Sequence, residues 1–283
     1  MHQGFSTSLE ANGVLGALTS ATRLLAPISP TPRLDAELLL AHALGISREA
    51  LLLDPARAVP PAFETLIARR LAHEPVAYIT GTKAFWTLDL HVTPDVLIPR
   101  PDSETLIEAA IAHFSASAPA KVLDLGTGSG ALLLASLDHW PGAWGLGVDR
   151  SAAGLAVARG NAQRLRFAER ACFVQGDWGA ALDGRFDLIL CNPPYVECGA
   201  WLPRDVADHE PAAALFAGPE GLDDYRKLAP QLARLLSPGG LAVVEIGADQ
   251  RESVTSLMQV EDLAVQCRQD LAGRDRCLEL RRH

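Results

Sequence analysis

The four residues Asn192-Pro193-Pro194-Tyr195 follow the apolar stretch 186–191, which has the composition of a buried strand. The two prolines end the strand and fix the backbone, and neither has a backbone N–H. The carbonyls of this turn can therefore face outward as acceptors, beside the side-chain carbonyl of Asn192. Two acceptors next to the flat ring of Tyr195 suit a planar group that bears an NH2. The motif thus indicates a substrate chemistry and a place for it.

A glycine-rich loop follows an earlier predicted strand, residues 121–125. Its residues are Gly126-Thr127-Gly128-Ser129-Gly130. Glycines permit a tight turn and a close approach of the backbone to a ligand. The spacing is G-x-G-x-G, which differs from the G-x-G-x-x-G of dinucleotide sites. The loop by itself therefore predicts a ligand without identifying it.

Two further predicted strands lead to acidic residues. Strand 143–148 runs into Asp149, whose carboxylate can accept hydrogen bonds from ribose hydroxyls. Strand 171–175 leads to Asp177 and Trp178, which can accept from an adenine amino group and pack on its ring. Considered alone, Asp177 is more commonly a turn or helix-cap residue, and Trp178 more commonly packs in the core. Three successive strand ends with suitable chemistry favour a nucleotide-like ligand.

This order of strand ends resembles the class I S-adenosylmethionine-dependent methyltransferases. The resemblance implies S-adenosyl-L-methionine as cofactor and S-adenosyl-L-homocysteine as product, with loop 126–130 beneath the methionine portion. Asp149 would hold the ribose, and residues 177–178 would border the adenine. Asn192 would lie against the cofactor as well. Asp124 is a candidate for the methionine amino group, and bracing of the loop is an equally good interpretation.

Methyl transfer to an amide or aryl amine is difficult because the nitrogen lone pair is conjugated. Two acceptors, the Asn192 side-chain oxygen and the Pro193 carbonyl, can each take one N–H and favour a tetrahedral nitrogen. The positive charge that develops strengthens both hydrogen bonds in the transition state. Pro194 and Tyr195 complete the site, and no strong base is required. The motif leaves two substrate classes open: glutamine amides in proteins and exocyclic amines of nucleic-acid bases.

The elements that must position these residues alternate between strand and helix from Lys121 onward. Such alternation predicts a mostly parallel sheet covered by helices on both faces, with ligands beyond the carboxyl ends of the strands. We therefore predict an α/β fold with a seven-stranded, mostly parallel, Rossmann-like methyltransferase sheet. The predicted strands are 121–125, 143–148, 171–175, 186–191, 241–246, 263–268 and 276–281, and the predicted helices are 130–139, 151–165, 222–236 and 248–258.

In the part of the chain before this sheet, the apolar residues recur at helical spacing. Residues 1–80 are predicted to form a small helical bundle, in which Leu34, Leu38 and Ala41 share a face and Gly45 ends a helix. Residues 81–99 are predicted to form a β-hairpin and linker, because apolar and polar residues alternate from 88 to 93 and prolines follow. The methyltransferase domain is then expected over residues 100–283.

The amino-acid composition argues against several classes of protein. The net charge is 25 − 34 = −9, and only three lysines are present, so the basic patch typical of nucleic-acid binding is not evident. Five cysteines without C-x-x-C spacing argue against disulfides and zinc, and we expect no metal and a cytoplasmic location. No apolar stretch is long enough to span a membrane, and no secretory signal is evident.

Several segments are similar to the release factor glutamine methyltransferases, the family called PrmC or HemK. The segment Val96-Leu97-Ile98-Pro99-Arg100-Pro101-Asp102-Ser103-Glu104 carries the most specific similarity. The other matching segments are 33–42, 74–81, 85–86, the glycine loop, 192–195, 209–211, 245–247 and 270–275. The similarity covers nearly the whole chain. His73 and Ala84 depart from the family pattern, which has Gly and Glu there, and both lie at the expected domain junction.

The similarity implies methylation of the glutamine amide in the Gly-Gly-Gln motif of class 1 peptide chain release factors. The helical domain would help to recognise the release factor, with no direct nucleic-acid binding. Asn192 and Pro193 would hold the amide, Tyr195 would pack on it, and Arg100 would lie near the pocket, where a linker role is equally expected. Two alternatives stay open: an exocyclic-amine methyltransferase of the adenine type, and a non-catalytic adaptor that binds S-adenosylmethionine.

Overall fold

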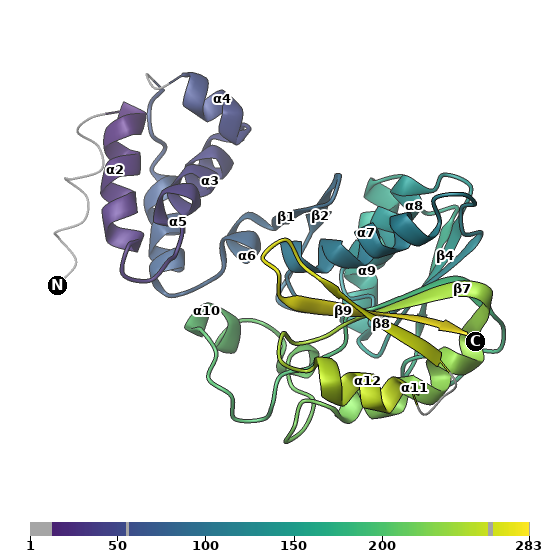
Figure 1. The fold of residues 1–283 in the computed structure, drawn as a ribbon. Coiled ribbons are helices and arrows are strands. Elements are labelled where there is room, and N and C mark those ends of the chain that lie inside the picture. Colours follow the sequence, from purple (N-terminus) through teal and green to yellow (C-terminus); the bar gives the residue numbers. More distant parts are fainter. Residues whose placement is uncertain (1–12, 55–56, 260–262, 283) are drawn as a thin grey trace. The chain divides into compact units, whose positions relative to one another are not determined.

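The computed structural model describes residues 13–54, 57–259 and 263–282, which form two compact units (Figure 1). The helical unit contains the chain up to Gly81 together with Leu202–His209. The α/β unit contains Thr82–Trp201 and the chain from Glu210 onward. The chain therefore leaves the α/β unit after Trp201 and returns to it at Glu210.

The helical unit is a bundle of short helices around its own apolar core, as the sequence predicts. Its helices are α2 (Gly13–Leu25), α3 (Pro32–Leu44), α4 (Arg48–Leu53), α5 (Ala62–Leu71), α6 (Val76–Thr80) and α10 (Arg204–Ala207). Gly45 ends α3 in a left-handed conformation, as predicted. Of the three residues predicted to share a face of α3, Ala41 is buried, but Leu34 and Leu38 are 39% and 36% exposed; Leu39 and Leu40 are fully buried instead. Helix α3 is apolar around most of its circumference, so periodicity did not single out the buried side.

A buried ion pair joins α5 to α3 in this unit. The Arg70 guanidinium donates to the Asp35 carboxylate at 2.9 Å, and the two side chains are 4% and 9% exposed. Thr31 donates a further hydrogen bond to the same carboxylate at 3.2 Å. A buried charge that loses its partner is costly, so this pair constrains how α3 and α5 pack.

The α/β unit opens with an antiparallel hairpin, β1 (Thr82–Phe85) and β2 (Leu88–His91). Leu88 and Leu90 are buried while Asp89 and His91 are exposed, in agreement with the predicted alternation. Phe85, Leu88 and Leu90 belong to the core of the α/β unit. The hairpin is thus a packed part of that unit.

The seven-stranded, mostly parallel sheet is confirmed, with the order β5-β4-β3-β6-β7-β9-β8. Strand β9 runs antiparallel to β7 and β8, and the other four strand pairs are parallel. The strands are β3 (Lys121–Leu125), β4 (Trp144–Asp149), β5 (Ala171–Gln175), β6 (Phe186–Cys191), β7 (Leu236–Glu245), β8 (Leu263–Gln269) and β9 (Asp275–Arg282). Since the chain goes from β3 outward to β5 and then returns to β6, the order reverses between β3 and β6, where sheets of this kind bind ligands.

Helices cover both faces of the sheet (Figure 1). On one face lie α7 (Glu104–His113), α8 (Ala131–His139) and α9 (Ala152–Arg164), and on the other α11 (Asp223–Leu235) and α12 (Arg251–Gln259). Each face of the sheet has its own apolar core, and successive residues of a strand pack into opposite cores. In β6, Leu188 belongs to one core and Ile189 to the other. Two short 3-10 turns are η2 (Pro101–Ser103) and η3 (Ala212–Ala214).

Two features of this unit differ from the sequence prediction. Helix α7 was not predicted, because the prolines that precede it dominate the local pattern. Strand β7 begins at Leu236, ahead of the predicted 241, and carries Pro238 and two glycines. These residues are typical of a turn, and the structure accommodates them with a register shift opposite Phe186 and Leu188. Among the helices described here, none has both the length and the apolar composition needed to cross a membrane.

Replacement of Arg70 by Met is expected to lower the free energy of unfolding of the helical unit by about 3–5 kcal/mol, because the buried Asp35 carboxylate loses its cation. Hydrogen exchange of the full-length chain at the amides of α3 and α5 measures this change. Arg69→Met is the matched control, since Arg69 is 41% exposed in its pair with Glu74 and should cost about 1 kcal/mol or less. Equal effects of the two variants would contradict the assigned burial cost.

Candidate functional site

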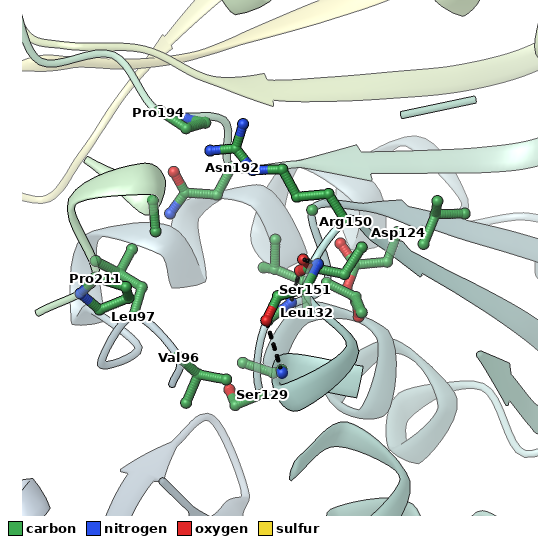
Figure 2. Close-up of a pocket in the computed structure, with 18 of the residues that line it drawn as sticks. Val96, Leu97, Asp124, Ser129, Leu132, Arg150, Ser151, Asn192, Pro194 and Pro211 are labelled. Atoms are coloured by element: carbon green, nitrogen blue, oxygen red, sulfur yellow. Dashed lines mark hydrogen bonds between the residues drawn. The ribbon is translucent and has the colours of Figure 1, made fainter. Parts of the chain in front are cut away.

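A pocket lies at the carboxyl ends of the parallel strands, where the predicted site residues were expected (Figure 2). The ends of β3, β4, β5 and β6 all contribute to its lining. Of the predicted site residues, the lining contains Gly126, Thr127, Gly128, Ser129, Asp149, Asp177, Trp178, Asn192 and Pro194. Gly130, Pro193, Tyr195 and Arg100 are outside the lining. Most of the predicted cofactor residues are therefore brought together in one cavity.

The glycine loop brings its backbone against the pocket. Gly126 has φ 75° and Gly128 has φ 52°, which side chains rarely adopt. A Cβ on Gly126 would lie 3.0 Å from Cζ3 of Trp178 and 3.8 Å from the backbone oxygen of Asn192. Gly126 thus lets the ends of β3 and β6 and the Trp178 ring converge. Gly130 caps the start of α8 and does not line the pocket.

The Asp149 carboxylate is fixed by two backbone amides. Gly128 N–H donates to its Oδ2 and Ser151 N–H donates to its Oδ1, both at 2.8 Å. These bonds tie the end of β4 to the glycine loop and to the start of α9. Each carboxylate oxygen has a second lone pair, so the group can accept further hydrogen bonds from hydroxyls in the pocket.

Asp124 places a buried carboxylate at the back of the cavity. Its Oδ2 accepts from Thr127 Oγ1 at 2.6 Å and from the Leu133 amide at 3.3 Å. Its Oδ1 is buried and has no hydrogen-bond partner among the residues that the structure describes. Burial raises the pKa of Asp124 to about 7, against the lowering effect of those two hydrogen bonds. An unpaired carboxylate oxygen beside a cavity is suited to a cationic donor such as an ammonium group.

Trp178 and Asp177 form the opposite part of the lining, after β5. Trp178 has φ 53°, and its indole N–H donates to Asp224 Oδ1 at 3.3 Å. The ring is thereby held against Gly126 with its remaining surface in the pocket. A fixed flat ring beside a carboxylate suits a planar amine such as an adenine base.

The residues after β6 divide between the pocket and the sheet edge. Asn192 and Pro194 line the cavity, and both are labelled in Figure 2. The Asn192 Nδ2 donates to Ser103 Oγ at 3.0 Å. The Tyr195 hydroxyl donates to Glu245 Oε1 at 3.3 Å, and its ring packs against the core between the sheet and α11. Tyr195 therefore extends along the sheet edge toward β7.

Ser103 and Glu245 are neighbours of this motif for which the sequence predicted no role. Ser103 Oγ donates to Glu245 Oε2 at 2.5 Å, and the two residues are 3% and 1% exposed. Burial raises the pKa of Glu245 to about 7, and burial with the nearby Glu245 charge raises the pKa of Tyr195 well above its usual value. The sequence contains two signals that could have indicated these residues. Ser103 lies in segment 96–104, and Glu245 ends a parallel strand at the same edge of the sheet.

Two chain segments form another side of the cavity: 95–99, and 211–214 around η3. The carboxylate of Glu210 joins them, because it accepts from the Ile98 amide at 3.2 Å and from the Arg100 guanidinium. Arg150 donates to the Ala213 carbonyl and so ties the same segment to the end of β4. Arg100 thus acts on the pocket wall through Glu210. In the part of the chain that the structure describes, no cluster of side chains has metal-ligating composition.

The shifted pKa of Asp124 gives a test that needs no ligand. In the folded protein Asp124 keeps its proton up to about pH 7, but in the unfolded chain it releases it near pH 3.8. Between these values the folded state binds more protons, so this group lowers the unfolding free energy as pH rises. The difference in melting temperature, Asp124→Asn minus wild type, should therefore become more positive from pH 4 to pH 7. A difference that is constant or falls would contradict the raised pKa, and Asp183→Asn, at an exposed position, should show no such trend.

Comparison with known protein families agrees with this geometry. Residues 16–81 match the PrmC N-terminal domain family, and residues 116–275 match a methyltransferase domain family. The release factor glutamine methyltransferase of Rhodospirillum rubrum is 46% identical over 278 residues, which cover 95% of this chain and 85% of that protein. The protein of the same name from Moorella thermoacetica is 42% identical over 271 residues, covering 92% of this chain and 95% of that one.

Solved structures support the fold of the α/β unit. The ribosomal protein L11 methylase of Lactobacillus delbrueckii subsp. bulgaricus superposes with a TM-score of 0.50 at 22% identity, covering 68% of this chain and 84% of that one. The 16S rRNA N2 G1207 methyltransferase of Thermus thermophilus gives 0.54 at 21% identity, covering 71% of this chain and 50% of that one. Sequence similarity over nearly the whole length and a shared fold lead to one conclusion: this chain belongs to the release factor glutamine methyltransferase family.

Proposed function

We propose that this chain transfers the methyl group of S-adenosyl-L-methionine to the side-chain amide nitrogen of a glutamine in peptide chain release factors. The glutamine is that of the Gly-Gly-Gln motif of class 1 release factors. Relatives with this name over most of the chain support the proposal. The observation that carries it is that Asn192 and the glycine loop line one pocket, so an NH2 acceptor and a methyl donor would meet there.

The residues of the pocket fit the cofactor. Asp124 Oδ1, which is buried and unpaired within the described part of the chain, would accept from the amino group of the methionine portion, directly or through water. Asp149, already oriented by two backbone amides, would accept from the ribose hydroxyls. Asp177 and the flat face of Trp178 would border the adenine. When bound, the cofactor supplies an electrophilic methyl group on a sulfonium sulfur.

Asn192 and Pro193 would hold the acceptor. The Asn192 side-chain oxygen and the Pro193 carbonyl each accept one N–H of the glutamine amide. This fixes the nitrogen and favours its change from planar to tetrahedral. Both hydrogen bonds strengthen as the nitrogen becomes positive, so they stabilise the transition state more than the ground state. The methylated nitrogen is a strong acid at that point and loses its proton to water.

Tyr195 and Arg100 keep supporting roles in the proposal. Tyr195 would form a flat wall beside the glutamine amide, with its hydroxyl anchored on Glu245. Arg100 would hold the segment around Pro99 in place through its ion pair with the buried Glu210. Both roles act on the shape of the acceptor site, so loss of either side chain should raise KM for the protein substrate.

A protein acceptor agrees better with the charge of the chain than a nucleic acid does. Binding of a duplex depends on many phosphate contacts, whereas this chain has a net charge of −9 and three lysines. An acidic surface suits a protein partner with basic segments. We further propose that the helical domain within residues 1–80 recognises the release factor, and that the enzyme acts in the cytoplasm.

The proposal is tested with methyl-labelled S-adenosylmethionine and, in parallel, purified class 1 release factor, duplex DNA and ribosomal RNA. Label should enter the release factor, and only when its Gly-Gly-Gln glutamine is present. A release factor with that glutamine replaced by alanine is the matched control. Label in either nucleic acid but not in the release factor would overturn the protein assignment in favour of the exocyclic-amine alternative.

Two substitutions should separate acceptor from cofactor binding. Asn192→Ala should lower kcat by on the order of 100-fold, because one transition-state hydrogen bond is lost, while the affinity for S-adenosylmethionine stays near wild type. Asp149→Ala should weaken that affinity by about 10- to 100-fold, because acceptors for the ribose and the brace of the loop are lost together. Calorimetry gives the affinities and single-turnover assays give the rates. The reverse pattern would contradict both assignments.

A further inference from the structure

We propose that Ser103 and Glu245 are positioning residues that hold the Asn192 amide with its oxygen turned toward the acceptor. The proposal rests on the proposed function, in which Asn192 accepts a hydrogen bond from the NH2 group to be methylated. An asparagine amide has one acceptor end and one donor end of nearly equal size. If the amide were reversed, its NH2 would face the NH2 of the substrate, and the site would repel the group it must bind.

Three elements bring the chain of hydrogen bonds together. Asn192 follows β6, Glu245 ends the neighbouring β7, and Ser103 lies in η2. Asn192 Nδ2 donates to Ser103 Oγ at 3.0 Å, and Ser103 Oγ donates to Glu245 Oε2 at 2.5 Å. Both Ser103 and Glu245 are almost completely buried. Water therefore does not compete for these groups, and their partners are the ones within the protein.

The chemistry of the three groups fixes the direction of this chain. An ionised carboxylate only accepts hydrogen bonds, so the single hydroxyl hydrogen of Ser103 must point to Glu245. The lone pairs of Ser103 Oγ can then only accept, and the group of Asn192 that faces Ser103 must be its NH2. The Asn192 oxygen consequently points away from Ser103. The orientation that the reaction requires is thus imposed by a carboxylate two hydrogen bonds away.

Glu245 is itself held as an acceptor by its surroundings. The Tyr195 hydroxyl donates to its other oxygen, Oε1, at 3.3 Å, and the buried guanidinium of Arg276 lies close enough to stabilise its charge. The Tyr225 hydroxyl donates to the Glu245 backbone carbonyl at 2.9 Å and so fixes the end of β7. The other ionisable groups that interact with Glu245 are Asp102, Cys191 and Cys277.

Protonation of Glu245 would remove this directional control. Burial raises the pKa of Glu245 to about 7, and a neutral carboxylic acid has a hydroxyl that can donate to Ser103. Ser103 could then donate to Asn192 and reverse the amide. The value of kcat at saturating cofactor should therefore fall as pH decreases through about 7. Asp124 titrates in the same range, but its effect would be on cofactor affinity and would appear in KM for S-adenosylmethionine.

Glu245→Gln is the sharpest variant because it changes the hydrogen-bond capacity with almost no change in shape. Tyr195 and Ser103 donate to different oxygens of Glu245, and in a glutamine one of these two positions is an NH2, which cannot accept. We expect kcat to fall roughly 10- to 100-fold at pH 8, the pH dependence near 7 to disappear, and the calorimetric affinity for S-adenosylmethionine to stay within about twofold. Glu279→Gln is the matched control, since Glu279 is a buried acid of β9 paired with Arg268 and outside the pocket.

The role of Ser103 is tested with one variant that removes its hydroxyl and one that keeps it. Ser103→Ala should lower kcat as Glu245→Gln does, and Ser103→Thr, which keeps the hydroxyl, should restore most of it. Ser136→Ala is the matched control, because the hydroxyl of this buried serine of α8 donates to the Leu132 carbonyl of its own helix. Thermal melts of each variant show whether the fold is intact. Wild-type kcat in Ser103→Ala, or a wild-type pH profile in Glu245→Gln, would overturn the proposal.

A measurement without turnover separates this proposal from the proposed function. In protein with 15N-labelled asparagine, the Nδ2 protons of Asn192 should exchange slowly with water in the wild type and faster in Ser103→Ala. If they do so in a wild-type chain that does not methylate release factors, the proposed function is wrong and the positioning role is retained. Exchange of Asn192 that does not respond to Ser103→Ala overturns the positioning role whatever the activity.

Discussion

The parallel pairing of β6 with β3 on one side and β7 on the other is the constraint on which the site depends. Leu125 pairs with Cys191 and Cys191 pairs with Val244, so the three strands end side by side. Gly126, Asn192 and Glu245 consequently follow one another across the sheet edge. The strand pairing thus brings the proposed cofactor loop, the proposed acceptor motif and Glu245 to one edge of the sheet.

Two buried carboxylates at this edge of the sheet differ in their hydrogen-bond partners. Asp124 lies near the end of β3 and Glu245 at the end of β7, and burial raises the pKa of both to about 7. One oxygen of Asp124 has no partner in residues 13–54, 57–259 and 263–282, which suits a cationic ligand, whereas both oxygens of Glu245 accept from protein hydroxyls. One carboxylate is therefore available to a ligand and the other is used to orient a neighbouring side chain.

Much of this arrangement could be predicted from the sequence, for physical reasons. Strand–helix alternation determines a parallel sheet, and residues after successive parallel strands must meet at one edge. The glycine loop, Asp149, Asp177, Trp178 and Asn192 were found in this way, and the structure places them around one cavity.

The remainder depends on contacts between distant segments. Ser103 and Glu245 are 142 positions apart. The hydrogen bonds that join Asn192 to Ser103 and Ser103 to Glu245 follow from packing that no local pattern encodes. Helix α7 and the early start of β7 were hidden by prolines and glycines that are typical of turns. The buried side of α3 could not be assigned because most of its positions are apolar.

Glu245, acting through Ser103, is proposed to fix which end of the Asn192 amide faces the acceptor. Neutron diffraction from crystals exchanged into D2O at pH 8 observes this direction, because it places the deuterium atoms. We predict the Ser103 hydroxyl deuterium on the line to Glu245 Oε2 and one Nδ2 deuterium of Asn192 on the line to Ser103. A Ser103 deuterium directed at Asn192, with the amide reversed, would contradict the account.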